Sequence, residues 1–327
     1  MLNLTIACWD YDRVRPMMDG RVRIEGAMAN FLSLAPEETF FRAFRDGEFE
    51  VSELSLSSTL MQLSRGECRY TPIPVFPSRS FRHSSIYIRV GSGIQRPQDL
   101  SGRRIAVSEY QVTAAMTARG LLQDEYGVRP SDIHWIQAGL EQAGRQDKVG
   151  WVPPADVRID KVADRTIAEL IDDGTVDGFI SPRAPSWFAP AQGKVRRLFP
   201  EDGSHEADWY HKRGVFPIMH VIGIRSDVLA ANPWVANSLV NAFIAAKDIA
   251  LSELAEVNAL KISLPLLTAH VAAARKLFGA DFWSYGLDKN RSTLETQLRW
   301  SFEQGLSTRP LGVDELFAPS TLARYRV

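Results

Sequence analysis

Short strand-like stretches alternate with amphipathic ones along the first 90 residues. The run Leu2–Ala7 alternates apolar and polar positions and is rich in β-forming residues, so it predicts a first strand. Residues 36–44 begin with a proline followed by two acidic residues and carry three phenylalanines, which predicts a helix that stops at Gly47. A strand at 50–55 and a helix at 57–65 follow. This alternation favours a mainly parallel sheet covered by helices.

The alternation continues through the middle of the chain, and the last third is mostly helical. Strands are expected at 85–90, 103–107, 133–136, 174–180 and 215–224, and helices at 110–126, 166–172, 233–256, 264–278 and 291–305. We interpret the chain as an α/β protein of two lobes, each a mainly parallel sheet flanked by helices. Lobe one comprises residues 1–90 plus 216–327, and lobe two comprises 91–215. Two crossing segments form a hinge, and we expect a ligand cleft between the lobes, at the strand ends.

Composition and charge narrow the classes of function. Hydrophobic residues make up 45% of the 327 and charged residues 24%, as in ordinary globular proteins. There are 38 basic and 39 acidic residues, and the basic pairs at 103–104 and 196–197 are short, which argues against a nucleic-acid partner. Cys8 and Cys68 cannot form a disulfide framework and lack metal-type spacing.

Several sequence signals are missing, and their absence guides the expectations. The N-terminal residues lack a secretory pattern, and no run of about 18 apolar residues is present, so we expect a cytoplasmic protein with no membrane partner. Dinucleotide, P-loop and esterase motifs are also missing, which leaves those chemistries without a sequence basis. The apolar C-terminal helices favour self-association, so we expect a homo-oligomer.

A cluster of basic side chains between residues 74 and 85 suggests an anion-binding site. Arg79 and Arg82 lie three residues apart, and guanidinium groups bind carboxylates bidentately. His83 follows directly and belongs to the residue type that titrates near neutral pH, and Ser84 adds a small hydroxyl. Arginines beside a proton carrier predict chemistry on a small acidic molecule, although surface ion pairs would also account for the arginines.

Several longer segments resemble a known family. The order of Asp99–Val107 and Gly174–Gly178 is similar to that of the type II periplasmic-binding-protein fold. More specific segments are Phe76–Ser84, Glu109–Ala115, Ser181–Pro185 and Phe216–His220. Together they resemble the 4,5-dihydroxyphthalate decarboxylase family, a cytoplasmic enzyme branch of that fold, over roughly residues 1–250. The resemblance implies conversion of 4,5-dihydroxyphthalate, a small aromatic dicarboxylate, to protocatechuate and carbon dioxide, with no cofactor.

Such a reaction must hold one carboxylate, protonate the ring carbon that carries the other, and help the hydroxyl para to that carbon lose its proton. Arg79, Arg82 and Arg183 are the candidate carboxylate ligands. His83 is the first candidate for proton donor, since general acids work best with a pKa near the operating pH. His220, in the returning strand, is the rival. Either histidine can instead be structural, His83 in the hinge and His220 in the core.

Further polar residues follow other predicted strands. Glu53 and Glu109 are candidates to accept the catechol proton or to orient a histidine. Gln111 and Thr113 start a helix whose N–H groups suit an anion, although Glu109 there is also a favourable residue for a helix start. The loop after the first strand adds two candidates for substrate binding, or alternatively an exposed charged turn, namely Tyr11 and Arg13.

Three alternatives remain open at this point. A metal held by Asp12, His83, Glu109 and His220 would bind a catechol, but no short-range ligand motif is present and we predict a metal-free site. A solute-binding protein would use the same cleft and arginines without turnover. A decarboxylase of another hydroxybenzoate would use the same residues.

Overall fold

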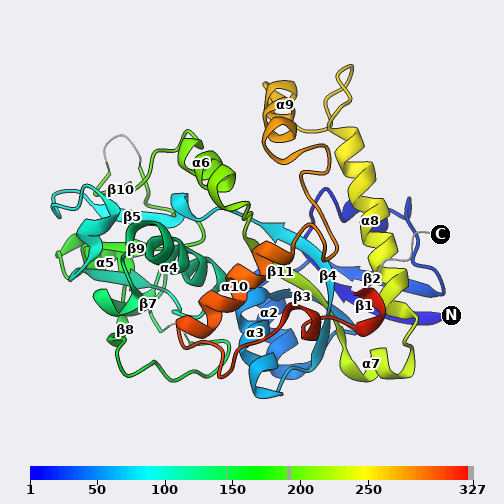
Figure 1. Ribbon diagram of the computed structural model, residues 1–327, viewed down its shortest axis with the longest axis horizontal. Helices are drawn as coiled ribbons and strands as arrows, with labels where there is room; N and C mark the ends of the chain where they lie inside the picture. Colours follow the sequence, from blue (N-terminus) through cyan, green and yellow to red (C-terminus); the bar gives the residue numbers. More distant parts are fainter. Residues whose placement is uncertain (145, 190–192, 323–327) are drawn as a thin grey trace.

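The computed structural model describes residues 1–144, 146–189 and 193–322, and it contains two sheets that lie in separate lobes (Figure 1). The first sheet has the strand order β2-β1-β3-β11-β4, and the second has the order β10-β5-β9-β6-β7-β8. Both are mixed sheets flanked by helices. The expected two-lobed α/β fold is therefore confirmed, with more antiparallel pairing than a mainly parallel sheet would have.

Lobe one is built from the N-terminal strands and one strand that returns late in the chain. β1 (Leu2–Ala7) pairs in parallel with β2 (Ala27–Leu32) and β3 (Val51–Ser55). β11 (Ile218–Arg225) lies antiparallel between β3 and β4 (Tyr70–Arg79). The three parallel strands therefore end at one edge of the sheet, next to the other lobe.

Strand β4 was not expected because it contains three prolines, at positions 72, 74 and 77. Proline cannot donate to a β ladder and is tolerated in edge strands. β4 lies at the edge of its sheet and pairs only with β11 among the described residues, with register shifts on either side of His220. The edge position accounts for a strand that its composition argues against.

Helices α2 (Pro36–Asp46) and α3 (Leu56–Arg65) follow β2 and β3, and both end at a glycine in the left-handed conformation, Gly47 and Gly66. These positions confirm the start and stop signals read from the sequence. The short helix α1 (Arg15–Met18) follows β1 and packs against α8 (Val235–Glu253).

Lobe two contains the middle of the chain. Its strands are β5 (Ile86–Arg89), β6 (Arg104–Val107), β7 (His134–Gly139), β8 (Ile159–Thr166), β9 (Gly178–Ile180) and β10 (Val195–Arg197). The strands β9, β6, β7 and β8 run parallel, whereas β5 is antiparallel to both of its neighbours. The helices are α4 (Thr113–Tyr126), α5 (Ile167–Asp172) and α6 (Ser204–Arg213).

The chain crosses between the lobes after β4 and returns after α6. The crossing segments touch, because the Ser80 N–H donates to the carbonyl of Pro217 at 3.1 Å. A 3-10 turn at His83–Ser85 leads into β5, which belongs to the second sheet. The boundary between the sheets thus lies before Ile86 rather than at residue 90.

The C-terminal part adds α7 (Ser226–Ala231), α8 (Val235–Glu253), α9 (Leu267–Phe278) and α10 (Arg291–Glu303). Helix α10 runs across the junction of the lobes (Figure 1). Its Gln297 side chain bonds both backbone groups of Ile218 in lobe one, at 3.0 and 2.8 Å. Its Trp300 lies against Gly120 of α4 in lobe two, where a Cβ would come within 2.2 Å of the indole. Helix α10 therefore packs against both lobes.

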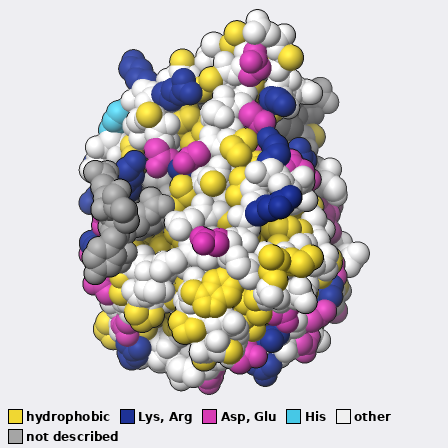
Figure 2. Space-filling model, turned by 90° about the vertical axis from the view of Figure 1, so that its right-hand side faces the viewer, with side chains coloured by type: hydrophobic (Ala, Val, Ile, Leu, Met, Phe, Trp, Pro, Cys, Tyr) yellow, Lys and Arg dark blue, Asp and Glu magenta, His cyan; other side chains and the backbone are white. Residues whose placement is uncertain are grey.

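The surface agrees with the near-neutral charge. On the face that carries α8 and the N-terminus, hydrophobic and charged side chains are interspersed and both signs of charge occur (Figure 2). Among the described residues, none of the helices combines the length and apolar composition that a bilayer crossing requires.

Candidate active site

A hydrogen-bonded group of three side chains lies at the end of the lobe-one sheet. Glu53 of β3 and His220 of β11 are diagonal neighbours on one face, since Glu53 is opposite Ile222. The Nδ1 atom of His220 lies 2.5 Å from Oε1 of Glu53, and the Tyr11 hydroxyl donates to the same oxygen at 2.7 Å. The Trp9 N–H donates to Oε2 at 2.9 Å. Three expected site residues, far apart in the sequence, thus form one group.

Burial and hydrogen bonding determine which of the three side chains are ionised. Burial raises the pKa of Glu53, but the positive charge of His220 and the donated hydrogen bonds outweigh it, so the pKa lies below its ordinary value. Burial, with the nearby Glu53 charge, raises the pKa of Tyr11 and keeps its phenol protonated. Glu53 is therefore an ionised acceptor that fixes a proton on Nδ1 of His220. Within the described residues, Nε2 of His220 has no hydrogen-bond partner.

Arg13 lies beside this group and is held by stacking. Its guanidinium is 4.3 Å from the ring centroid of Tyr11 and 4.1 Å from that of Trp283. Its Nε donates to the carbonyl of Pro77 at 2.8 Å, and its Nη1 pairs with Asp12 at 2.9 Å. The Arg13 guanidinium therefore stacks between the rings of Tyr11 and Trp283 and restricts the position of Tyr11.

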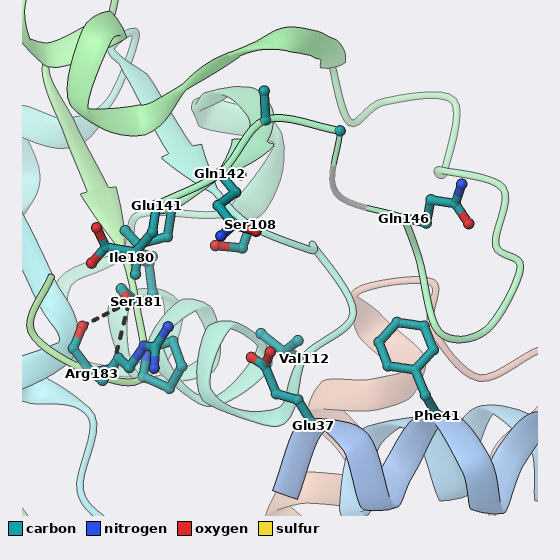
Figure 3. A pocket seen from close by; sticks show the side chains of 15 residues that line it. Glu37, Phe41, Ser108, Val112, Glu141, Gln142, Gln146, Ile180, Ser181 and Arg183 are labelled. Carbon is teal, nitrogen blue, oxygen red and sulfur yellow. Dashed lines mark hydrogen bonds between the residues drawn. The ribbon is translucent and has the colours of Figure 1, made fainter. Parts of the chain in front are cut away.

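A cavity of about 450 Å³ lies between the lobes, beyond the carboxyl ends of β6, β7 and β9 (Figure 3). Helix α2 forms the wall on the lobe-one side, with Glu37 and Phe41 directed at the lobe-two loops (Figure 3). The lobe-two lining comes from the loops that follow these strands, at Ser108, Val112, Gly139–Gly144, Gln146 and Ile180–Arg183. Ligands of open α/β sheets bind in this position.

One of the expected arginines lines this cavity, and a second contacts a lining residue. The side chain of Arg183 extends into it (Figure 3), and no acidic side chain of the described residues forms an ion pair with it. Arg82 donates through Nη1 to the carbonyl of Pro182, a lining residue, at 3.1 Å. Burial lowers the pKa of Arg82 to about 10, so its guanidinium remains charged at neutral pH. Among the described residues, the cavity lining therefore has one cationic side chain, Arg183.

Three contacts connect the cavity with the Glu53–His220 pair. Phe40, which precedes the lining residue Phe41, packs edge-on against the His220 ring with centroids 4.8 Å apart. Arg82 contacts both Pro182 and, through Nε, the sulfur of Met219 at 3.0 Å. The histidine is therefore linked to the cavity through Phe40 and Arg82, although Tyr11, Glu53 and His220 are not among the residues that line it.

The third contact crosses between the lobes. The Thr113 hydroxyl, at the start of α4, lies 3.0 Å from that of Ser55 and accepts the Ser57 N–H at 3.0 Å. Ser55 is paired with His220 in the sheet, and Val112 lines the cavity. Thr113 thus joins the two lobes rather than pointing into solvent.

Glu109 and Gln111 lie in a buried cluster of lobe two with a residue that the sequence did not suggest. Lys148 places its ammonium 2.6 Å from Oε1 of Glu109, and both side chains are almost fully buried. Gln111 donates to Oε2 of Glu109 at 3.3 Å. Lys148 follows a polar loop in which no spacing distinguishes it, so sequence reasoning had no signal for it.

Arg79 and Ser84 lie outside the cavity lining. Arg79 is 8% exposed and donates to the carbonyls of Phe216, at 2.7 Å, and of Ser284, at 3.3 Å. Burial lowers its pKa to about 10. The Ser84 carbonyl accepts a bond from Arg197. Both residues contact the hinge region, and neither is among the residues that line the cavity.

His83 lies in an aromatic environment rather than beside Glu53. Its ring packs against Phe199 and Trp209, with centroids 5.2 and 5.7 Å away, and it is 1% exposed. Burial lowers its pKa to about 4, which disfavours the imidazolium form that a general acid would use at neutral pH. In the described residues, no group of three or more His, Cys, Asp and Glu side chains is placed to hold a metal.

The buried histidine predicts a pH dependence of stability. Because the pKa of His83 falls from 6.5 to about 4 on folding, the unfolded chain takes up the proton first. We expect its contribution to be intact above pH 6.5 and lost as pH falls toward 4, at roughly 3 kcal/mol. Urea unfolding of wild type and His83→Gln across this range tests this expectation. An equally steep decline in the variant would contradict it.

Comparison with known proteins gives the family. The chain is 43% identical over 327 residues to 4,5-dihydroxyphthalate decarboxylase of Comamonas testosteroni, covering 100% of this chain and 99% of the relative. The protein of the same name from Pseudomonas putida is 43% identical over 210 residues, covering 64% of this chain and 81% of the relative. The chain belongs to the 4,5-dihydroxyphthalate decarboxylase family. The resemblance seen in the sequence motifs is thereby confirmed.

Solved structures relate this family member to a binding-protein fold. The aliphatic sulphonate binding protein SsuA of Escherichia coli aligns with a TM-score of 0.53 at 13% identity, covering 98% of this chain and 99% of that one. SsuA of Xanthomonas axonopodis pv. citri, bound to MOPS, aligns with a TM-score of 0.52 at 12% identity, covering 98% of both chains. At such low identity the likeness concerns the fold alone. No family model matches the chain.

Proposed function

We propose that this protein decarboxylates 4,5-dihydroxyphthalate to protocatechuate and carbon dioxide. The observation that carries the proposal is the Glu53–His220–Tyr11 group, connected through Phe40 and α2 to a cavity lined by Arg183, in a chain 43% identical to decarboxylases named for that substrate. The first group supplies a proton, and the arginines attract a dianion. Both functions are needed at one aromatic ring.

The substrate explains why a proton donor and cations suffice. Each carboxylate of 4,5-dihydroxyphthalate is para to one hydroxyl, which releases electron density to the carbon that bears that carboxylate. Protonation of this carbon forms a C–H bond and interrupts the aromatic system. Cleavage of the C–C bond then returns its electron pair to the ring and releases carbon dioxide. The barrier lies mainly in placing the proton on carbon.

We assign the proton transfer to His220. Its Nδ1 is bound to Glu53, so Nε2 is the atom that can carry a proton to the ring. The ionised Glu53 stabilises the imidazolium form before transfer and keeps the ring orientation afterwards. Phe40 against the ring edge restricts its rotation. The neutral histidine is then protonated again from solvent.

We assign substrate anchoring to Arg183 and Arg82. Arg183 lines the cavity on its lobe-two side, and Arg82 donates to the carbonyl of the lining residue Pro182. A carboxylate bound there would direct the rest of the ring toward α2 and His220. Arginine binds carboxylates through paired N–H donors, which fixes ring orientation as well as charge.

The proposal is tested by incubating the purified protein with 4,5-dihydroxyphthalate and following protocatechuate by chromatography and carbon dioxide by headspace analysis. We expect turnover that a chelator such as EDTA leaves unchanged. Tight reversible binding without product would instead indicate a solute-binding protein. Turnover of a different hydroxybenzoate in preference to 4,5-dihydroxyphthalate would contradict the substrate assignment.

Replacing Arg183 by methionine should mainly weaken substrate capture. We expect KM to rise about 10- to 100-fold, the range for loss of a charge-assisted hydrogen bond, with a smaller change in kcat. Steady-state kinetics measure both constants. Arg158→Met removes an exposed arginine elsewhere in lobe two and should leave both unchanged. An unaltered KM in Arg183→Met would remove Arg183 from the site.

A further inference from the structure

The loop after β7 forms nearly half of the lobe-two lining of the cavity, and Lys148 attaches the end of this loop to the interior of lobe two. We call residues 140–144 and 146–148 the β7 loop; six of them line the cavity. Lys148 is 8% exposed, and its ammonium lies 2.6 Å from Oε1 of Glu109. Its backbone N–H donates to Oε2 of the same carboxylate at 3.2 Å. The loop thus ends in a two-point attachment to the residue that follows β6.

The residue before Lys148 fixes the direction of this attachment. Oδ1 of Asp147 accepts from Gln137 of β7 at 2.6 Å, and Oδ2 pairs with Lys161 of β8 at 2.8 Å. The backbone of Lys148 is therefore held against the sheet on one side while its side chain reaches Glu109 on the other. Such a pair is poor evidence for stability, because burying two charges costs about as much as their attraction returns. Its position at the end of a loop that lines the cavity indicates another role.

Lys148 also reaches across to lobe one. Its Nζ lies 5.4 Å from the ring centroid of Phe41, which projects from α2 into the cavity (Figure 3). An ammonium at this distance from an aromatic face is attracted to it. The neighbouring Phe40 packs against the ring of His220. A continuous set of contacts therefore runs from the β7 loop through Lys148 and α2 to the histidine.

We propose that Lys148 is a positioning residue that holds the β7 loop against α2 and thereby sets the spacing between the lobe-two wall and His220. This inference rests on the proposed function for its kinetic consequence. Lys148 acts through Glu109 and Phe41 and does not itself touch the reacting atoms. Its loss should loosen the ring in the cavity and misalign it with Nε2 of His220.

The kinetic test compares Lys148→Met, Lys148→Arg and Phe41→Leu. We expect Lys148→Met to raise KM and lower kcat so that kcat/KM falls about 10- to 100-fold, as misplacement of bound groups does. Lys148→Arg, which keeps a cation for Glu109 and Phe41, should recover most of this loss. The two single changes interrupt one contact. The loss of kcat/KM in the double variant Lys148→Met, Phe41→Leu should therefore be at least about threefold smaller than the product of the two single losses. The proposal would be overturned if the loss in the double variant equalled the product of the single losses, or if Lys148→Arg recovered no activity.

A second variant guards against misfolding, because Lys148→Met alone leaves a carboxylate buried beside an apolar side chain. Lys148→Met with Glu109→Gln removes both charges and should fold. We expect it to keep the raised KM even so. Lys194→Met breaks an exposed ion pair with Asp172 in the same lobe and should leave kcat and KM unchanged. A double variant with wild-type constants would show that the pair has no positioning role.

Hydrogen exchange separates failure of this inference from failure of the proposed function. In the ligand-free protein, we expect the amides of the β7 loop to exchange faster in the double variant than in wild type, with β1 and β3 unchanged. Equal exchange in the β7 loop would overturn the positioning role whatever the substrate is. Faster exchange in a protein that does not turn over 4,5-dihydroxyphthalate would support the role and refute the substrate assignment.

Discussion

Replacing His220 by glutamine is expected to lower kcat by about 10²–10⁴-fold with little change in KM, the signature of a lost general acid. Glutamine cannot deliver a proton to carbon, whereas the arginines that hold the substrate are unaffected. Single-turnover kinetics with 4,5-dihydroxyphthalate would measure the chemical step directly. Circular dichroism would verify that the variant keeps the secondary structure of the wild type.

The matched control for this variant is His83→Gln, which alters the other histidine first considered as the acid. His83 is buried among aromatic rings and has no contact with Glu53 or Tyr11 among the interactions described. We expect kcat of this variant to change less than about threefold, since general acid catalysis contributes far more than that. A large loss of kcat in His83→Gln with near-normal His220→Gln would reverse the assignment.

Local signals in the sequence predicted much of the fold. Helix α2 starts at Pro36, which favours a first helical position, and ends at Gly47, which adopts the left-handed conformation. Both effects are local to one helical turn, so the sequence reports them. The strand β4 was missed for the opposite reason. Its prolines argue against a strand, and only its position at the sheet edge, which depends on the return of β11, makes it one.

In the candidate site too, single residues could be recognised from the local sequence, whereas contacts between distant residues could not. Tyr11, Glu53 and His220 were recognised as plausible residues because each follows or ends a hydrophobic stretch. Their pairing was not predictable, because Glu53 and His220 are 167 residues apart and meet only through the order of strands β3 and β11. His83, beside two arginines, had the stronger local signal, but burial decides its protonation and sequence does not report burial.

The last prediction concerns Glu53, whose carboxylate is hydrogen-bonded to His220. Glu53 accepts bonds from Tyr11, from the Trp9 N–H and from His220, and its ionised form is favoured by all three. Glu53→Gln keeps the shape but removes the charge that stabilises the imidazolium, and it places an amide where an acceptor is needed. We expect kcat to fall about 10²–10⁴-fold, comparable to loss of the acid itself.

The same change should lower the free energy of unfolding by about 2–4 kcal/mol, because buried donors lose a charged acceptor. Glu50→Gln is the matched control, since Glu50 lies just before the same strand and pairs with Arg225 nearer the surface. We expect that control to keep wild-type kcat. If Glu53→Gln instead destabilised the protein yet retained kcat, Glu53 would be a structural acceptor only. A carboxylate that stabilises the imidazolium of His220 must affect the chemical step as well as the fold. That result would therefore mean that proton transfer to the ring does not depend on Glu53.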